Sequence, residues 1–177
     1  MKRFTELMLV LLFLNACTGK LDLKQTEDFD AFPVYTADLF YADITGSDFY
    51  VQNMPLTELN DTVPLKIFGQ KQVKDGLVKV DFFFDVSNPF PARFAFEVQF
   101  LKAGRIPLTA FADTVEAGAA SPFRHEYVFT IHKDSLPEIV LTEDMEIRLQ
   151  RLDTVDLRND TRSMHIRSKA DVYVHIQ

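Results

Sequence analysis

Residues 78–86 read Val78-Lys79-Val80-Asp81-Phe82-Phe83-Phe84-Asp85-Val86, and in them apolar and charged side chains alternate. Successive side chains of a β-strand point to opposite faces, so the alternation separates an apolar face from a charged one. The apolar face contains Val78, Val80, Phe82, Phe84 and Val86. Phe83 is the exception, because it falls on the charged face. The stretch predicts a half-buried strand that packs against a second layer.

Turn-forming residues flank this strand on both sides. Asp75-Gly76 stands just before it and suits a tight hairpin turn from a preceding strand at residues 63–73. Ser87-Asn88-Pro89-Phe90-Pro91 follows it and ends the strand, because proline cannot donate a hydrogen bond to a sheet ladder. The sequence therefore predicts a hairpin before the strand and a chain reversal after it.

The same period-two alternation recurs through most of the chain. Further strands are expected at residues 34–44, 94–100, 106–112, 125–131, 145–149 and 164–176. One interior segment favours a short helical turn, because Asp134 or Ser135 can cap it and Pro137 stands near its start. About eight strands with turns between them predict an all-β fold, an antiparallel immunoglobulin-like sandwich of about 7–8 strands.

The N-terminus has a different pattern. Lys2 and Arg3 precede an apolar run that leads through Leu14-Asn15-Ala16 to Cys17, the single cysteine of the chain. The run is shorter than the roughly 20 residues that span a bilayer. The layout resembles the signal peptide and lipobox of a bacterial lipoprotein. An ordinary secretory signal with an incidental Cys17, or a buried N-terminal helix, are the alternatives.

The lipoprotein resemblance implies cleavage before Cys17 and attachment of lipid, palmitate included, to that residue. It divides the chain into a signal-peptide helix (1–16), a tether (17–32) and a sandwich domain (33–177). It also implies an outer-membrane lipoprotein of the bacterial cell envelope, because Thr18 and not Asp follows the cysteine. The periplasmic and the surface face of that membrane both stay open.

Two further resemblances concern the sandwich. The strand at 78–86, the Asn88-Pro89-Phe90 turn, the strand at 94–100 and the segment Gly104–Leu108 resemble one half of a water-stress/LEA14-type immunoglobulin-like domain. The part from Leu21 through the strand at 34–44 is similar to uncharacterised lipoproteins of flavobacteria and other Bacteroidetes. Both resemblances imply a β-sandwich of the envelope with unknown partners, and neither implies an enzyme.

Composition restricts the classes of partner. The net charge of −7 and the pI near 5.0 argue against nucleic acid, whose phosphates attract basic surfaces. The chain has 17 Phe and no Trp, which indicates a dry, Phe-rich core and weakens a sugar-stacking platform. With one cysteine there is no internal disulfide, so stability must come from the core.

No group of residues has the spacing of a metal or catalytic site. The four histidines lack the close pairing of metal ligands and are expected at the surface or rim: His125, His132, His165 and His175. A loop of oxygen ligands could bind Ca²⁺ or could be a solvated polar loop, and it lacks the regular spacing and the turn glycine: Asp153, Asp156, Asn159 and Asp160. No nucleophile motif is present, so no catalytic residue, metal or cofactor is expected.

One recurring triplet suggests a modification. Asp followed by Ser or Thr and an apolar residue occurs four times and resembles the O-glycosylation sequon of Bacteroidetes secreted proteins. The modified residues would be Thr62, Thr114, Ser135 and Thr154, all expected in loops or at strand ends. The alternative is that Asp-Thr and Asp-Ser simply form turns.

The expected function is that of a non-catalytic binding or assembly module, anchored by lipid on Cys17 and bound to an envelope protein partner. The alternative is a carbohydrate-binding accessory lipoprotein of a glycan-uptake system, which needs exposed aromatic rings clustered at one edge of the sandwich. Tyr41, Tyr50 and Tyr127 are its candidates. A hydrolase would need two convergent carboxylates. Phe83, Leu101 and Phe111 have outward parity, so they either form an exposed apolar strip or are buried by another segment.

Overall fold

The alternating stretch forms most of strand β5 (Leu77–Asn88), in which Val80, Phe82, Phe84 and Val86 are fully buried. The computed structural model describes residues 30–118 and 121–176, of which Phe32–Ile176 forms one compact unit. The signal peptide, Cys17 and almost all of the tether lie outside the described residues, so what the sequence predicts for them stays a prediction.

The described chain is built mainly of strands. Before β5 come β1 (Val34–Thr45), η2 (Gly46–Phe49), β2 (Tyr50–Val51), β3 (Met54–Pro55), β4 (Glu58–Pro64), η3 (Lys66–Gly69) and α2 (Lys71–Gly76). After β5 come β6 (Phe94–Lys102), η4 (Ala103–Arg105), β7 (Ile106–Val115), β8 (Phe123–His132), η5 (Pro137–Leu141), β9 (Thr142–Arg151) and β10 (Ser163–Val174). Here η denotes a short 3₁₀ helix. The helical turn expected at 134–140 corresponds to η5.

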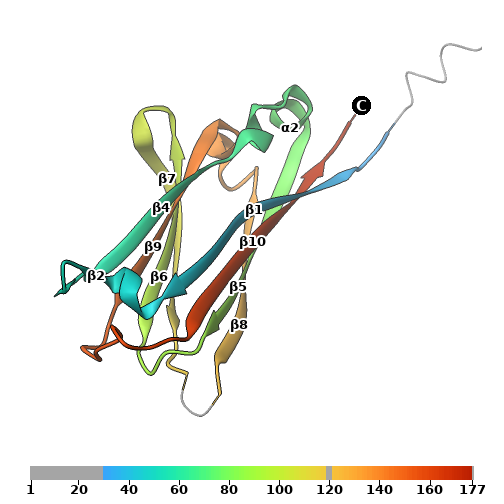
Figure 1. Cartoon of the computed structure of the whole chain (residues 1–177). Coiled ribbons are helices and arrows are strands. Elements are labelled where there is room, and N and C mark those ends of the chain that lie inside the picture. The colour runs from blue at the N-terminus through green and yellow to red at the C-terminus, as the bar shows by residue number, and fades with distance from the viewer. Residues whose placement is uncertain (1–29, 119–120, 177) are drawn as a thin grey trace, which may run out of the picture. The chain divides into compact units, whose positions relative to one another are not determined.

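Two four-stranded sheets pack face to face (Figure 1). The strand order is β1-β10-β5-β8 in the first sheet and β4-β9-β6-β7 in the second, and all the pairs are antiparallel. Strands β2 and β3 form a separate two-stranded hairpin. The all-β antiparallel sandwich is therefore confirmed, with eight main strands.

The order of the strands differs from that of an immunoglobulin domain, which pairs neighbours in sequence several times. Among the eight main strands of the described chain, only β6 and β7 are both consecutive and paired. Every other connection between main strands crosses from one sheet to the other. Each sheet thus interleaves strands from early and late in the chain, which is the arrangement of a jelly roll.

Phenylalanine rings of both sheets meet between the layers. Phe82 packs against Phe100 with ring centroids 4.5 Å apart, and Phe84 packs against Phe96 at 5.6 Å. All four rings are fully buried. Burial of one such ring contributes about 1.5–3 kcal/mol, and the ring–ring geometry adds about 0.5–1.5 kcal/mol. These pairs hold the two sheets together where no disulfide does.

The three apolar residues of outward parity do not form one strip. Leu101 is buried because β6 bulges at this point, and Phe111 packs into the core with its ring 6.2 Å from that of Phe84. Phe83 lies on the outer face of the first sheet, half buried, with Lys169 Nζ 4.6 Å from its ring centroid. Of the two alternatives, burial is therefore confirmed for Leu101 and Phe111, whereas Phe83 stays on the outer face, where a lysine covers its ring.

The turn after β5 is held by Asn88, which is fully buried. Its Nδ2 donates to the carbonyl oxygens of Ala92 (2.9 Å) and Glu116 (2.8 Å), and its Oδ1 accepts from the Phe90 N–H at 2.9 Å. Gly118 packs against this turn, where an added Cβ would lie 2.4 Å from the Asn88 carbonyl oxygen. The Asn88 amide thus joins the connection between β5 and β6 to the residue that follows β7.

The prediction of a strand at residues 63–73 is wrong. Strand β4 ends at Pro64, and residues 66–76 are mostly helical, in η3 and α2. The buried side chains in this segment are mainly Phe68 and Val73, while the polar residues between them face solvent. Tertiary packing of these two side chains therefore favours helical turns over the strand that the weak alternation predicted.

The hairpin expected at Asp75-Gly76 is also wrong, because β4 and β5 belong to different sheets. Gly76 instead ends α2 where the backbone of His175 passes, and an added Cβ would lie 2.2 Å from the His175 carbonyl oxygen. Val78, expected on the buried face, is exposed because the pairing of β5 with β10 shifts register there. Leu77 is buried in its place.

The two ends of the sandwich carry different elements (Figure 1). Strand β1 begins at one end, where Val34 pairs with Tyr173 near the end of β10. Elements η3, α2, η4 and η5 lie at that end, which we call the α2 end. Elements η2, β2, β3 and the loop between β9 and β10 lie at the other, which we call the hairpin end.

Candidate functional site

The β2–β3 hairpin projects from the hairpin end. Val51 pairs with Met54 across Gln52 and Asn53, whose φ angles are 51° and 65°. A two-residue turn of this kind needs positive φ at both central residues and favours Asn and Gly, so Gln52 holds a strained backbone. The turn leaves Val51 and Met54 exposed at its tip.

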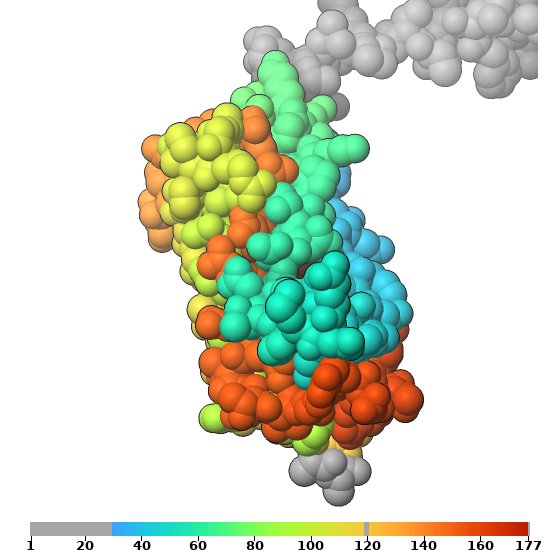
Figure 2. All heavy atoms as spheres, turned by 60° about the vertical axis from the view of Figure 1, so that its left-hand side comes forward, coloured from blue at the N-terminus to red at the C-terminus, as the bar shows by residue number. Residues whose placement is uncertain are grey.

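Tyr50 joins the base of this hairpin to the loop before β10. Its hydroxyl donates to Asp156 Oδ1 (2.9 Å) and accepts from the Leu157 N–H (3.0 Å). The guanidinium carbons of Arg151 and Arg158 lie 5.7 and 5.5 Å from its ring centroid, which is within cation–π range. Figure 2 shows the hairpin and the loop side by side on the surface, although they are far apart in sequence.

A pocket of about 420 Å³ opens between the hairpin and the loop. Pro55, Leu56 and Leu152 supply its apolar lining, and its polar lining includes Tyr50, the two arginines named above, Asp153 and Asp156. Leu152 is exposed beside it, as are the two apolar residues of the hairpin tip. We call this the hairpin pocket. It combines a concave shape, an exposed apolar rim and fixed hydrogen-bonding groups, as binding sites do.

The acidic residues of this loop pair with arginines. Asp156 binds Arg158 (2.6 Å), Asp160 binds Arg162 (2.6 Å), and Asp153 binds Arg93 (3.0 Å). Hydrogen bonds from Arg158 hold the pKa of the Asp156 carboxyl well below its usual range, and those from Arg93 lower the pKa of Asp153. Among the described residues, no group of three His, Cys, Asp or Glu side chains is placed to hold a metal ion. The aspartates of this loop are ionised, but arginines already balance their charges. This pairing disfavours the calcium hypothesis.

The sequence pointed to part of the hairpin pocket, although not to a common site. Tyr50 was a candidate for sugar binding, Asp153 and Asp156 for calcium, and Thr154 for glycosylation. Arg151 and Arg158 were not candidates, because their proximity to the Tyr50 ring depends on the fold. One local signal was available: Asp-x-Arg occurs twice, at Asp156–Arg158 and Asp160–Arg162, and two-residue spacing in an irregular loop brings such groups together. The strained turn that exposes Val51 and Met54 has no comparable signal in the sequence.

The tyrosines that would mark a sugar platform do not cluster. Tyr127 is buried between the sheets and donates to the Thr114 carbonyl oxygen at 2.9 Å. Tyr41 is 56% exposed on the outer face of the first sheet, with Arg167 5.5 Å from its ring centroid. Tyr50 lies at the hairpin end. The three rings therefore do not make the shared aromatic surface that the carbohydrate alternative requires.

The buried phenol of Tyr127 predicts a pH-dependent stability. Burial raises the pKa of Tyr127 to about 12, above its ordinary value of about 10. Stability from the neutral phenol is therefore complete below about pH 10 and is lost as pH rises through about 12. At neutral pH the unfolding free energy of wild type should exceed that of Tyr127→Phe by about 1 kcal/mol, because the phenol donates a hydrogen bond to Thr114. That advantage should shrink by about 1–3 kcal/mol near pH 12.

Urea unfolding of both proteins across this pH range measures the effect. The comparison cancels the titration of lysines, which both proteins share. A difference in unfolding free energy that stays constant from neutral pH to about pH 12 contradicts the prediction.

The histidines lie where the sequence expected them. His125, His132 and His165 are exposed, and His165 contacts Asp43 across the first sheet. His175 is half buried and stacks on Phe32 with ring centroids 4.5 Å apart. They belong to the surface and rim of the sandwich.

The four residues of the glycosylation prediction fall into two classes. Ser135 and Thr154 are exposed in a turn and a loop, as expected. Thr62 and Thr114 lie within β4 and β7, the edge strands of the second sheet, and are half buried. Thr62 lies two residues before the end of β4, and Thr114 lies one residue before the end of β7. Glycosylation of all four stays a prediction, with the first two more accessible.

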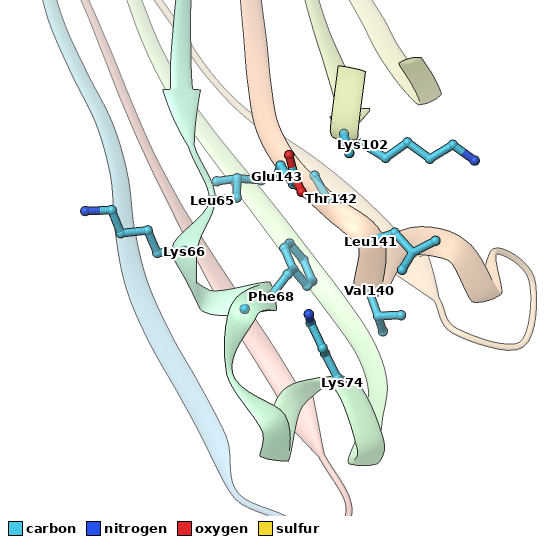
Figure 3. Close-up of a pocket in the computed structure, with 11 residues that line it drawn as sticks. Leu65, Lys66, Phe68, Lys74, Lys102, Val140, Leu141, Thr142 and Glu143 are labelled. Carbon is cyan, nitrogen blue, oxygen red and sulfur yellow. The ribbon is translucent and has the colours of Figure 1, made fainter. Parts of the chain in front are cut away.

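A second pocket, of about 500 Å³, opens at the α2 end. Leu65 and Phe68 form its buried floor, and Lys66, Lys74 and Lys102 belong to its lining. Figure 3 shows Lys74 pointing toward the Phe68 ring, with Lys66 and Lys102 at opposite sides of the pocket. We call this the lysine pocket.

Comparison with known proteins adds little to this picture. No family model matches the sequence, and the search of curated proteins found no match. Among solved structures, a candidate secreted protein of Parabacteroides distasonis matches 67% of this chain at 16% identity, with a TM-score of 0.48. This chain spans 40% of the length of that protein.

Two viral proteins are similar at lower identity. The VP2 subviral particle of infectious bursal disease virus matches 81% of this chain at 9% identity (TM-score 0.42), and the chain spans 33% of it. The enzymatically active domain of tailspike protein 4 of bacteriophage CBA120 matches 82% at 10% identity (TM-score 0.39), and the chain spans 19% of it. None of these similarities is close enough to carry an argument on function. In the described part of the chain, no helix is long and apolar enough to cross a membrane.

Proposed function

We propose that the chain is a lipid-anchored protein of the bacterial cell envelope, held at the outer membrane through Cys17, that acts as a non-catalytic binding or assembly module. The hairpin pocket is the site for its envelope protein partner. The observation that carries this proposal is the exposed apolar rim of that pocket: Leu152 belongs to the lining, and Val51 and Met54 are exposed next to lining residues of the hairpin. Resemblance to Bacteroidetes lipoproteins and to water-stress/LEA14-type domains supports the location, not the partner.

The chemistry of the hairpin pocket favours binding. A general acid or base works best with a pKa near the working pH. Here the neighbouring arginines lower the pKa of Asp153 and of Asp156, so both carboxylates stay ionised. The Tyr50 hydroxyl is engaged on both sides, by a carboxylate and by a backbone N–H. These fixed groups can orient a bound chain, while the apolar rim supplies the contact area.

Photocrosslinking in native membranes tests the partner. Val51 and Val128 are both 52% exposed, at the hairpin tip and on the outer face of the first sheet respectively, so each can carry a photoreactive residue with the other as control. We expect one reproducible envelope protein from position 51 and none from position 128. Leu152→Asp, which places a charge on the apolar rim, should remove that product.

Recovery of free monomer alone from position 51 would overturn the proposed site, as would the same product from both positions. The anchor is tested separately, by mass spectrometry of the N-terminal peptide of the protein purified from membranes. Acyl chains on Cys17 are expected, and an unmodified thiol would contradict the lipid anchor whatever the crosslinks show.

A further inference from the structure

Exposed apolar side chains gather at the α2 end. Phe32, Val34, Val78, Ile106 and Leu141 are all exposed there, although they come from β1, β5, β7 and η5 or flank them. The second sheet contributes two of them at one corner, because Lys102 pairs with Ile106 on one side and with Thr142, next to Leu141, on the other. Soluble proteins seldom concentrate exposed apolar groups in this way without a partner surface.

Lysines accompany these apolar groups. Three lysines line the lysine pocket, whose lining has a single acidic residue, Glu143. Lys66 and Lys74 make no ion pair with another described residue, and neither does Lys71 of α2, whereas Lys102 binds Glu138 at 2.6 Å. The arginines at the hairpin pocket are engaged by carboxylates or by a carbonyl oxygen. Ammonium groups without a counter-charge therefore gather at the α2 end, in a chain whose net charge is −7, and Lys169 on the outer face of the first sheet is a further lysine without an ion pair to a described residue.

The preceding chain also joins the sandwich at this end. Strand β1 begins at Val34 beside the end of β10, and Cys17 lies 15 residues before Phe32. Fifteen residues span at most about 54 Å, whatever their conformation. A lipid on Cys17 would keep the α2 end close to the bilayer, where local concentrations in the millimolar range make weak contacts effective.

We propose that the α2 end is a membrane-contact surface that rests on anionic lipid headgroups. The ammonium groups of Lys66, Lys71 and Lys74 meet the phosphates, and Ile106 and Leu141 enter the interfacial region beside them. This inference rests on the proposed lipid anchor and deepens it, because it sets the orientation of the anchored domain. With the α2 end on the bilayer, the hairpin pocket faces away from it and is open to a partner.

A fluorescent probe at each end tests the orientation. Leu141 (48% exposed, α2 end) and Leu152 (45% exposed, hairpin end) are matched positions, and each can be changed to cysteine for a polarity-sensitive label. A lipidated Cys17 has no free thiol, so the label is specific. The acylated full-length mature protein is reconstituted in vesicles of phosphatidylcholine, with or without phosphatidylglycerol. We expect a blue shift and increased emission at position 141 in the vesicles with phosphatidylglycerol, and no change at position 152.

Charge variants test the lysines. The double variant Lys66→Gln, Lys74→Gln should weaken contact by about 25-fold, or about fivefold for each charge lost near an anionic surface. Lys169→Gln, on the outer face of the first sheet, removes one such charge elsewhere; it is the control for either single variant, Lys66→Gln or Lys74→Gln, and should leave the signal at position 141 unchanged. High salt should weaken contact in wild type more than in the double variant.

The outcomes separate this inference from the proposed function. No shift at position 141 in an acylated protein overturns the membrane-contact surface and leaves the anchor standing, whereas an unmodified Cys17 overturns the anchor itself. Equal shifts at both positions overturn the orientation. A shift that is the same without phosphatidylglycerol overturns the role of the lysines, and one that appears without vesicles and grows with protein concentration assigns the surface to a second copy of the chain.

Discussion

Asn88→Ala is expected to destabilise the sandwich by about 3–5 kcal/mol, a large part of the 5–15 kcal/mol that stabilises a typical domain. The reason is the number of buried groups that one amide satisfies. The substitution removes three hydrogen bonds and leaves the carbonyl oxygens of Ala92 and Glu116 and the Phe90 N–H without their partner. An unsatisfied buried polar group costs about 1–3 kcal/mol. Urea unfolding followed by circular dichroism measures the loss.

Two comparisons locate the effect of Asn88. Asn88→Asp keeps the oxygen that accepts from Phe90 but replaces the donor to Ala92 and Glu116 with an acceptor, so it should also be strongly destabilising. Thr130→Ala loses one hydroxyl bond, to Asp81, on the outer face of the first sheet and should cost about 1 kcal/mol. A loss of less than about 1 kcal/mol in Asn88→Ala contradicts the role of the turn as a tie between the sheets.

Phe84→Ala is expected to destabilise the protein by about 3–5 kcal/mol, and the adjacent Phe83→Ala by about 1 kcal/mol or less. Phe84 is fully buried and packs against Phe96 and Phe111, so its removal leaves a cavity between the sheets. Phe83 lies half buried on the outer face under Lys169. Because the same residue type is removed at neighbouring positions, comparison of the two variants separates the effect of burial in the core from that of a cation–π contact at the surface.

Thermal and urea unfolding of the two variants give the comparison. Both should keep the m-value of wild type, because a change in m would indicate that the substitution altered the unfolded or the native state more widely. Equal destabilisation by the two substitutions would mean that the outer face is covered in solution, which contradicts the assignment of Phe83 to an open sheet face.

The strands were predictable because their signal is local. At 78–86, 94–100 and 164–176 the alternation identifies both the strand and its buried face, since burial of one face acts on every second residue. It fails where a bulge shifts the register, as at Val78, and where a few buried side chains hold helical turns, as in residues 66–76. A bulge depends on the partner strand, which the local pattern does not contain.

The candidate sites were much less predictable. Tyr50 meets Asp156 and Leu157 only because β9 and β10 bring their connecting loop to the hairpin. The lysine pocket gathers residues of η3, α2, β6 and η5 in the same way. Apart from the two Asp-x-Arg pairs of the loop before β10, these groups have no common spacing in the chain.

The local pattern of the sequence predicts an all-β chain, the positions of seven of the eight main strands to within a few residues and the buried face of most of them. The pairing of the strands depends on contacts between residues that are far apart in the chain. Period-two alternation predicts that one face of a strand is buried, but it does not predict which strands pack against that face. In this sandwich nearly all the pairs join strands that are not consecutive, so the order is set by packing of the Phe-rich faces and by the crossing turns such as Asn88. The jelly-roll order, the hairpin pocket and the basic, apolar α2 end all follow from those long-range choices.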